Sequence, residues 1–80
     1  MGKFEVRLTN ASGSDTRIYT HHSLSSALED YDNYDSADKI LAEFGQESMR
    51  QNETVGVELV CIKDEFRGVV ININTYKARQ

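Results

Sequence analysis

The chain has 80 residues, of which 39% are hydrophobic and 28% are charged, and this composition is typical of one small soluble domain spanning residues 1–80. Nine Lys and Arg against thirteen Asp and Glu give a formal net charge of −4, which argues against binding of nucleic acid or an anionic membrane by overall charge. The single cysteine, Cys61, excludes an internal disulfide framework and a cysteine-rich zinc site. The apolar runs are too short for a membrane helix and the N-terminal segment does not have the pattern of a signal peptide, so we expect a cytoplasmic protein.

Residues 3–21 have the pattern of a β-hairpin. Residues 3–9 alternate between apolar and polar side chains, which is the period of a half-buried strand. Residues 10–15 are rich in Asn, Ser, Gly and Asp, which favour turns. A second strand is predicted over residues 16–21, with Ile18 facing the core on the same side as Phe4, Val6 and Leu8.

From Ser23 onward the apolar spacing becomes helical, and it predicts two short helices. The first follows an N-cap at Ser23 or Ser26, and its apolar stripe consists of Leu24, Ala27, Leu28 and Tyr31. The second follows an N-cap at Asp35 or Ser36, and its stripe consists of Ala37, Ile40, Leu41 and Phe44. We expect the second helix to kink or stop at Gly45, because glycine favours the end of a helix over its interior.

Residues 54–63 and 69–76 are rich in Val and Ile and flank a polar turn, which predicts a second hairpin. The most apolar faces of these strands meet only if the loop has an odd number of residues, three or five, with Gly68 in the left-handed conformation. This register predicts two pairs that each share a face, Leu59 with Ile71 and Val60 with Val70.

The order β-β-α-α-β-β predicts an α+β fold, a two-layer sandwich in which a four-stranded antiparallel sheet carries both helices on one face. The order of the strands within the sheet does not follow from the pattern. The predicted core between the two layers comprises Phe4, Val6, Leu8, Ile18, Leu24, Leu28, Tyr31, Ile40, Leu41, Phe44, Val57, Leu59, Cys61, Val69, Ile71 and Ile73.

Few residues carry catalytic or metal-binding chemistry. Cys61 with His21 or His22 as its base would make a small cysteine enzyme, but Cys61 lies in mid-strand on the predicted core face, where a thiol packs as an apolar side chain. Adjacent histidines in an extended segment point to opposite faces, and zinc needs three or four ligands. The acidic stretch of residues 30–41 lacks the glycine that a calcium loop needs at its sixth position. We expect no metal, no cofactor and no catalytic activity, and the cysteine–histidine enzyme is the third hypothesis.

Residues 29–47, the acidic segment, carry a net charge of −6, because seven carboxylates are accompanied by Lys39 alone. Glu29 and Asp30 lie near the predicted end of the first helix, where the helix dipole disfavours anions. A purely structural role does not explain that placement, so we predict that the acidic segment binds a partner; the alternative is a solvated face that keeps the protein soluble. The seven carboxylates are those of Glu29, Asp30, Asp32, Asp35, Asp38, Glu43 and Glu47.

Two further candidate surfaces are predicted on the outer face of the sheet. An apolar surface on the second hairpin, suited to homodimerisation or docking, consists of Val60, Ile62, Val70 and Tyr76. A basic and aromatic surface on the first hairpin, suited to nucleic acid, consists of Lys3, Arg7, Arg17, Tyr19 and His21. A nucleic-acid-binding sheet that uses the second surface is the alternative function.

The favoured function is a small acidic interaction module without catalytic activity, which inhibits a protein by covering its basic, nucleic-acid-binding surface. Small phage-encoded anti-CRISPR and anti-restriction proteins offer an analogy, which rests on size and charge alone. Seven carboxylates in the acidic segment, spread over about 28 Å if it is all helical, give less than half the charge density of DNA, which is one charge per about 1.7 Å. The acidic segment therefore predicts a local mimic of phosphates rather than a full mimic of DNA.

Overall fold

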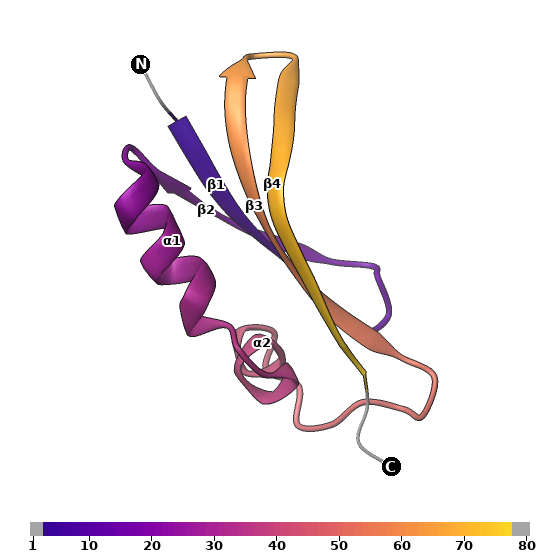
Figure 1. Ribbon diagram of the computed structural model, residues 1–80. Coiled ribbons are helices and arrows are strands. Elements are labelled where there is room, and N and C mark those ends of the chain that lie inside the picture. The colour runs from indigo at the N-terminus through magenta and orange to yellow at the C-terminus, as the bar shows by residue number, and fades with distance from the viewer. Residues whose placement is uncertain (1–2, 78–80) are drawn as a thin grey trace.

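Two hairpins with two helices between them follow one another in the predicted order. The computed structural model describes residues 3–77. Its elements are β1 (Lys3–Thr9), β2 (Thr16–His21), α1 (Leu24–Asn33), α2 (Ala37–Glu43), β3 (Thr54–Asp64) and β4 (Arg67–Lys77) (Figure 1). Among the described residues, no helix has both the length and the apolar character needed to cross a lipid bilayer.

The four strands form one antiparallel sheet in the order β2-β1-β3-β4, which confirms the predicted α+β architecture. Both helices lie on one face of this sheet (Figure 1). The helices contact β1, β2 and β3, whereas β4 has few close contacts with either helix in the described part of the chain. As a result β3 has a strand on each edge and helices over one face, and β4 lies at an open edge.

The core lies between the helices and the two central strands. Val6 of β1 pairs with Leu59 of β3, and the next inward row pairs Leu8 with Val57. All four side chains are fully buried, and removing one aliphatic side chain of this size from water stabilises a fold by about 1.5–3 kcal/mol. The helices close this core with Ala27, Tyr31, Ile40 and Leu41.

The second helix stops before Gly45, which is one of the two predicted outcomes. Gly45 has a φ of +66°, a left-handed conformation that glycine adopts without steric cost. Its N–H donates to the carbonyl of Ala42 at 3.1 Å, and the N–H of Gln46 donates to the carbonyl of Leu41 at 3.0 Å. These two hydrogen bonds form a Schellman motif, which satisfies carbonyl groups that the end of the helix leaves without partners.

The second strand of the first hairpin faces the opposite way from the prediction. Ile18 lies on the outer face and is 53% exposed, whereas Tyr19 pairs with Val6 on the helix side. The loop fixes this register, because the buried side chain of Asn10 accepts a hydrogen bond from the N–H of Asp15 at 3.1 Å. A change of register by one residue moves every side chain of a strand to the other face, so the predicted core position of Ile18 is wrong.

The second hairpin contains a β-bulge that the sequence pattern does not reveal. Val60 pairs with Val70, as predicted, but Leu59 pairs with Asn72 and not with Ile71. The register shifts between Leu59 and Val60, which makes Ile71 an extra residue of β4. The prediction is therefore confirmed for the valine pair, whereas Ile71, as the extra residue of the bulge, has no partner opposite it in β3.

This bulge decides which face the C-terminal half of β4 presents. Ile73 pairs with Glu58 on the outer face and is 60% exposed. Tyr76 pairs with Val55 on the helix side. Both placements are opposite to those predicted, because the extra residue reverses the alternation of the residues that follow it.

The turn of the second hairpin also differs in form from the prediction. The strands end at Asp64 and begin again at Arg67, so two residues lie between them, and a second bulge makes Lys63 an extra residue. A turn of two residues and a bulge thus replace the predicted loop of three or five residues. The predicted left-handed conformation of Gly68 is wrong, since the positive-φ glycines among residues 3–77 lie elsewhere.

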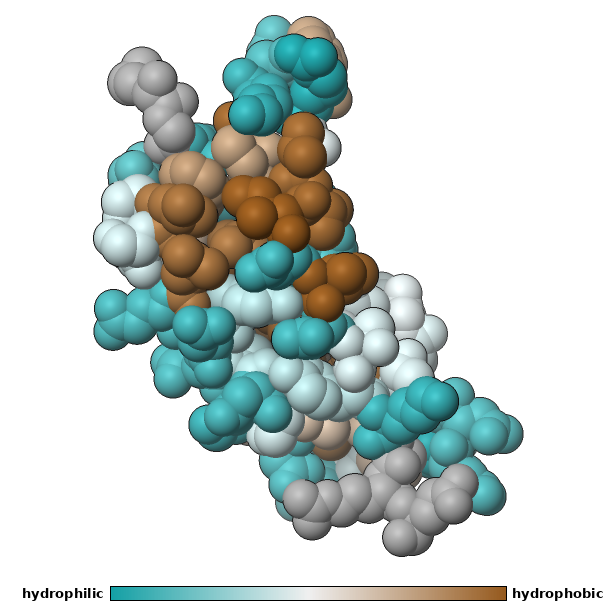
Figure 2. Space-filling view, viewed as in Figure 1, coloured by the Kyte–Doolittle hydropathy of each residue, from teal (hydrophilic) through white to brown (hydrophobic). Residues whose placement is uncertain are grey.

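The helical layer leaves part of the predicted core uncovered. Figure 2 shows apolar residues gathered beside α1 and over the half of the β3–β4 hairpin near its turn. The reason is length: α1 has 10 residues and α2 has 7, about 15 Å and 10 Å of helix, whereas β4 has 11 residues, about 36 Å of strand. Three predicted core residues are 43% to 48% exposed, namely Leu24, Val69 and Ile71. Ile18 and Ile73, at 53% and 60%, are exposed because they lie on the outer face.

Gly68 gives Val60 its place on the outer face. A Cβ atom at Gly68 would lie 2.8 Å from Val60 Cγ1 and 3.3 Å from Ile62 Cδ1, closer than carbon atoms approach without strain. We therefore predict that Gly68→Ala lowers the free energy of unfolding by about 1–3 kcal/mol, as overpacking does. Gly56→Ala is the matched control, because its Cβ would have no contact shorter than 3.8 Å. Urea unfolding measures both variants, and equal midpoints would show that Val60 does not depend on the space at Gly68.

Candidate functional site

The structure divides the seven carboxylates of the acidic segment into two groups. Asp30 and Glu43 are half-buried and bonded to residues of β2. The other five are exposed or lie on the solvent side of the helical layer: Glu29, Asp32, Asp35, Asp38 and Glu47. The first group holds the two layers together, and the second is available to a partner.

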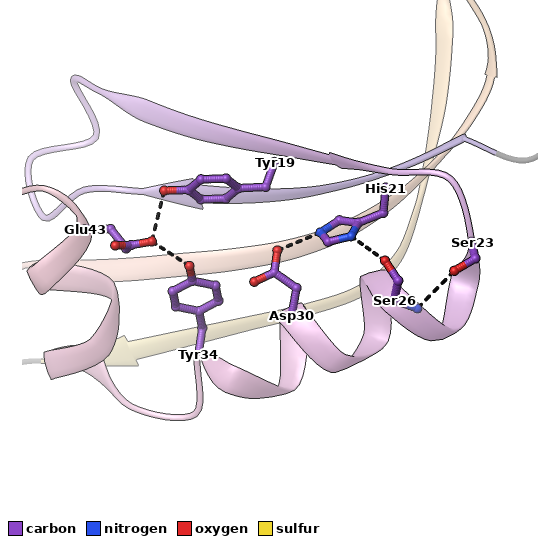
Figure 3. A network of polar contacts seen from close by, with 7 residues as sticks. All are labelled: Tyr19, His21, Ser23, Ser26, Asp30, Tyr34 and Glu43. Atoms are coloured by element: carbon purple, nitrogen blue, oxygen red, sulfur yellow. Dashed lines mark hydrogen bonds and ion pairs between the residues drawn. The ribbon is translucent and has the colours of Figure 1, made fainter.

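Glu43, the last residue of α2, receives hydrogen bonds from two tyrosines. Its Oε1 accepts from Tyr34 Oη at 2.7 Å and from Tyr19 Oη at 2.9 Å (Figure 3). These bonds, that of Tyr34 foremost, lower the pKa of Glu43. Burial, followed by the bond to Glu43, raises the pKa of both Tyr34 and Tyr19 above its ordinary value. A charged carboxylate between two protonated phenols is therefore the stable state at neutral pH, and it connects both helices to β2.

His21, the last residue of β2, forms a second connection, to α1. Its Nδ1 lies 2.6 Å from Ser26 Oγ and its Nε2 lies 2.8 Å from Asp30 Oδ2 (Figure 3). A serine, a histidine and a carboxylate in series also form the constellation that activates a nucleophile in many hydrolases. In such hydrolases a backbone N–H stabilises the oxyanion that forms when the serine attacks its substrate. Here the N–H of Ser26 instead donates to Oγ of the N-cap residue Ser23 at 3.2 Å, so it is not free for that role. We interpret the trio as a clamp between sheet and helix.

Three of the exposed carboxylates line a groove beside α2, which we call the acidic groove. It has a volume of about 490 Å³. One part of its wall is apolar, and there Tyr76 is held in place by a hydrogen bond from its Oη to the carbonyl of Tyr34 at 3.0 Å. The carboxylates of the acidic groove belong to Asp35, Asp38 and Glu47, and its apolar wall is formed by Leu41, Met49 and Tyr76. One cation, Lys77, lies at the groove as well, so that carboxylates outnumber cations in its lining by three to one.

The ion pair in the acidic groove is exposed to solvent, and a cation of a partner can take the place of its lysine. Lys39 forms an ion pair with Asp35 at 2.8 Å, and these side chains are 54% and 66% exposed. The hydrogen bond from Lys39 lowers the pKa of Asp35, but an ion pair this exposed contributes little to stability, so a partner cation can replace it. Carboxylates beside an apolar wall suit a Lys or Arg side chain, whose stem packs on the wall while its head reaches the oxygens. Among residues 3–77, no group of three or more potential ligands is arranged to hold a metal ion.

The apolar surface predicted on the second hairpin is not formed as one surface. Val60 is 1% exposed and Ile62 is half-buried, while Val70 is 48% exposed. Tyr76 lies on the helix side of the sheet, in the acidic groove. Val60 is therefore covered by its own chain. The exposed aliphatic residues of this hairpin lie on β4, at the open edge of the sheet.

The predicted basic surface is divided between the two faces of the sheet. Lys3 and Arg7 lie on the outer face, where Arg7 forms an ion pair with Glu5 at 2.7 Å. The other three members, Arg17, Tyr19 and His21, lie on the helix side, and the Arg17 guanidinium stands 5.7 Å from the centre of the Phe44 ring, a cation–π distance. A nucleic-acid surface that contains all five residues is not formed.

Cys61 is not placed beside a histidine base. His21, Phe4 and Cys61 occupy one row across β2, β1 and β3, with Phe4 in the middle. Strands lie about 4.8 Å apart, so two strand spacings separate the thiol from the imidazole. Cys61 is half-buried, and His22 is exposed. This geometry gives no support to the cysteine–histidine enzyme.

Comparison of the chain with protein-family models, with curated proteins and with solved structures finds no match. Sequence reasoning missed Met49 and Tyr76 as parts of the site, because Met49 lies off the helical stripe and Tyr76 reaches the groove only through the bulge in β4. It also missed Tyr19 as a partner of Glu43, since that contact requires the reversed face of β2.

The tyrosine bonds of Glu43 predict a specific dependence of stability on pH. Because folding lowers the pKa of Glu43, the resulting stabilisation is present above the ordinary glutamate pKa of about 4.3 and is lost as the pH falls through the lower pKa of the folded state. We predict that Glu43→Gln lowers the free energy of unfolding at neutral pH by about 1 kcal/mol. It should also flatten the acid decline that urea unfolding shows in the wild type. Glu47→Gln at an exposed site is the control, and an equal loss in both variants would contradict a specific role for these bonds.

Proposed function

We propose that the protein is a small non-catalytic interaction module that docks on a basic protein surface through its helical layer, with the acidic groove at the centre of the contact. The observation that supports this most directly is the combination in one groove of three carboxylates and an apolar wall. That combination suits the long side chains of Lys and Arg, which have an apolar stem and a charged head.

The surroundings of the acidic groove favour the same kind of partner. The acidic segment has a net charge of −6, and five of its carboxylates lie on the solvent side of the helices. Clustered charges of one sign add their fields, which speeds the approach of an oppositely charged surface and suppresses partners of like charge. In this proposal Glu29 and Asp32 attract the partner from a distance, and the residues of the groove contact it directly.

A basic surface on a cytoplasmic protein is most often one that binds nucleic acid, because such surfaces gather Lys and Arg to neutralise phosphates. A module that occupies the same side chains competes with the nucleic acid. We therefore propose that the protein inhibits a nucleic-acid-binding partner by covering its basic surface.

Titration of isotope-labelled protein with an oligo-arginine peptide tests the groove by NMR. We predict chemical-shift changes at Leu41, Met49 and Tyr76, and binding that weakens steeply with added salt. The double reversal Asp38→Lys with Glu47→Lys should weaken binding about tenfold. The same change of net charge made outside the groove, at Glu29 and Asp32, should weaken it less. If the groove reversal binds as tightly as the wild type, the proposed docking site is wrong.

Competition extends the test to inhibition. The wild type should release a fluorescent DNA duplex from the same peptide, and the groove reversal should not. Direct binding of the duplex by the protein alone would instead support the alternative of a nucleic-acid-binding sheet.

A further inference from the structure

β4 is an edge strand with the composition of an interior strand. β3 and β4 are both 11 residues long. In β3, which has a neighbour on each side, four of the five aliphatic residues, Val55, Val57, Leu59 and Val60, are at most 1% exposed, and the fifth, Ile62, is half-buried. In β4, which has a neighbour on one side, the aliphatic residues Val69, Val70, Ile71 and Ile73 are 46% to 60% exposed.

The open edge of β4 lacks the usual protection against pairing with another strand. Edge strands are normally short, charged, interrupted by proline or covered, because their free N–H and C=O groups accept a further strand. β4 is long, and residues 68–76 contain no charged residue and no proline. The other edge strand, β2, has 6 residues, and its side chains Tyr19 and His21 are bonded to the helical layer.

We propose that β4 pairs antiparallel with β4 of a second copy, so that one sheet continues through both subunits. The two-fold axis of such a pair is perpendicular to the sheet, which places the helices of both copies on the same face. This inference goes beyond the proposed function and does not depend on it. The proposed interface differs from the apolar surface predicted from the sequence. Val60, which belongs to that surface, is buried in its own chain, and the exposed aliphatic residues lie along β4.

The match of β4 with itself identifies the occupant as a second copy. Pairing of identical edges closes after two subunits, whereas pairing of β4 with β2 would add copies without end. Antiparallel pairing also brings the turn of one hairpin to the end of β4 in the other copy. Residues 68–76 carry no charge, so in the full-length register like charges meet only where Arg67 of one copy faces Lys77 of the partner subunit. Arg67 is already paired with Asp64 at 3.2 Å, which reduces repulsion between the two strands.

The size of the interface predicts a modest affinity. An edge about 36 Å long on a layer about 10 Å thick gives roughly 360 Å² of flat contact per copy, less than the roughly 800 Å² per partner of a standard stable interface. Phe66, which is 89% exposed at the turn, adds apolar area close to the partner. We therefore expect a dissociation constant on the order of micromolar.

Sedimentation of the wild type over a range from about 1 μM to 1 mM tests for the dimer. Two variants then locate it, because Ile73 and Ile18 occupy the same row on the outer face at opposite edges, and are 60% and 53% exposed. Ile73→Lys and Ile18→Glu each place a charge beside an opposite charge of the neighbouring strand, Glu58 or Arg7. We expect Ile73→Lys to raise the dissociation constant by about tenfold or more and Ile18→Glu to leave it unchanged.

Each other outcome contradicts the proposal. A wild type that stays monomeric throughout the series excludes the dimer without reference to any variant. Equal weakening by both variants would show that the outer faces pack on each other, and growth into large assemblies would show pairing of β4 with β2. Circular dichroism confirms that both variants fold. The peptide titration reports on the acidic groove separately, so failure of the dimer and failure of the proposed function are distinguishable.

Discussion

The helical layer is shorter than the sheet it covers, and the remaining features of the molecule depend on this mismatch. The molecule extends 42 Å along its longest axis but 23 Å and 19 Å across, whereas α1 is about 15 Å long and α2, which runs in a different direction (Figure 1), is about 10 Å long. The covered part of the sheet becomes a fully buried core of β1 and β3. The uncovered part of the β3–β4 hairpin keeps its apolar residues in contact with water (Figure 2), and β4, which the strand order places at an edge, is therefore an apolar edge.

Hydrogen bonds determine which strands the short layer covers. Glu43 binds Tyr19 of β2, and Asp30 binds His21 of the same strand (Figure 3), so the helices are held over the β2 side of the sheet. Their hydrogen bond to β4 lies at its C-terminal end, where Tyr76 donates to the carbonyl of Tyr34. The bonds to β2 engage the two carboxylates that face inward. The carboxylates that remain point to solvent, and those near α2 meet the apolar wall of the acidic groove. The fold thus separates the acidic groove beside the helical layer from an apolar edge of the sheet.

Much of the fold follows from the sequence because it depends on local pattern. The alternation of β1, the stop at Gly45 and the order of elements are confirmed, and so are the helical stripes apart from Leu24, which is 43% exposed. The errors about which face a strand residue occupies have one physical origin, which is that a period of two fixes the spacing of side chains in a strand but not the face on which they begin. The loop held by Asn10 decides that face for Ile18, and the bulge at Ile71 decides it for Tyr76. The acidic groove could not be predicted for the same reason, since it joins segments that only these choices of face bring together.

Amide hydrogen exchange of the wild type, in dilute and in concentrated solution, tests most directly whether the open edge of β4 is a pairing surface. In an antiparallel strand, N–H groups point alternately to one neighbour and to the other, so alternate amides of β4 point away from β3. We predict that these amides exchange about tenfold more slowly in concentrated protein, while the edge amides of β2 keep the same rate. Equal exchange of the β4 edge amides at both concentrations would contradict the claim that the mismatch between helices and sheet leaves an edge for a second copy.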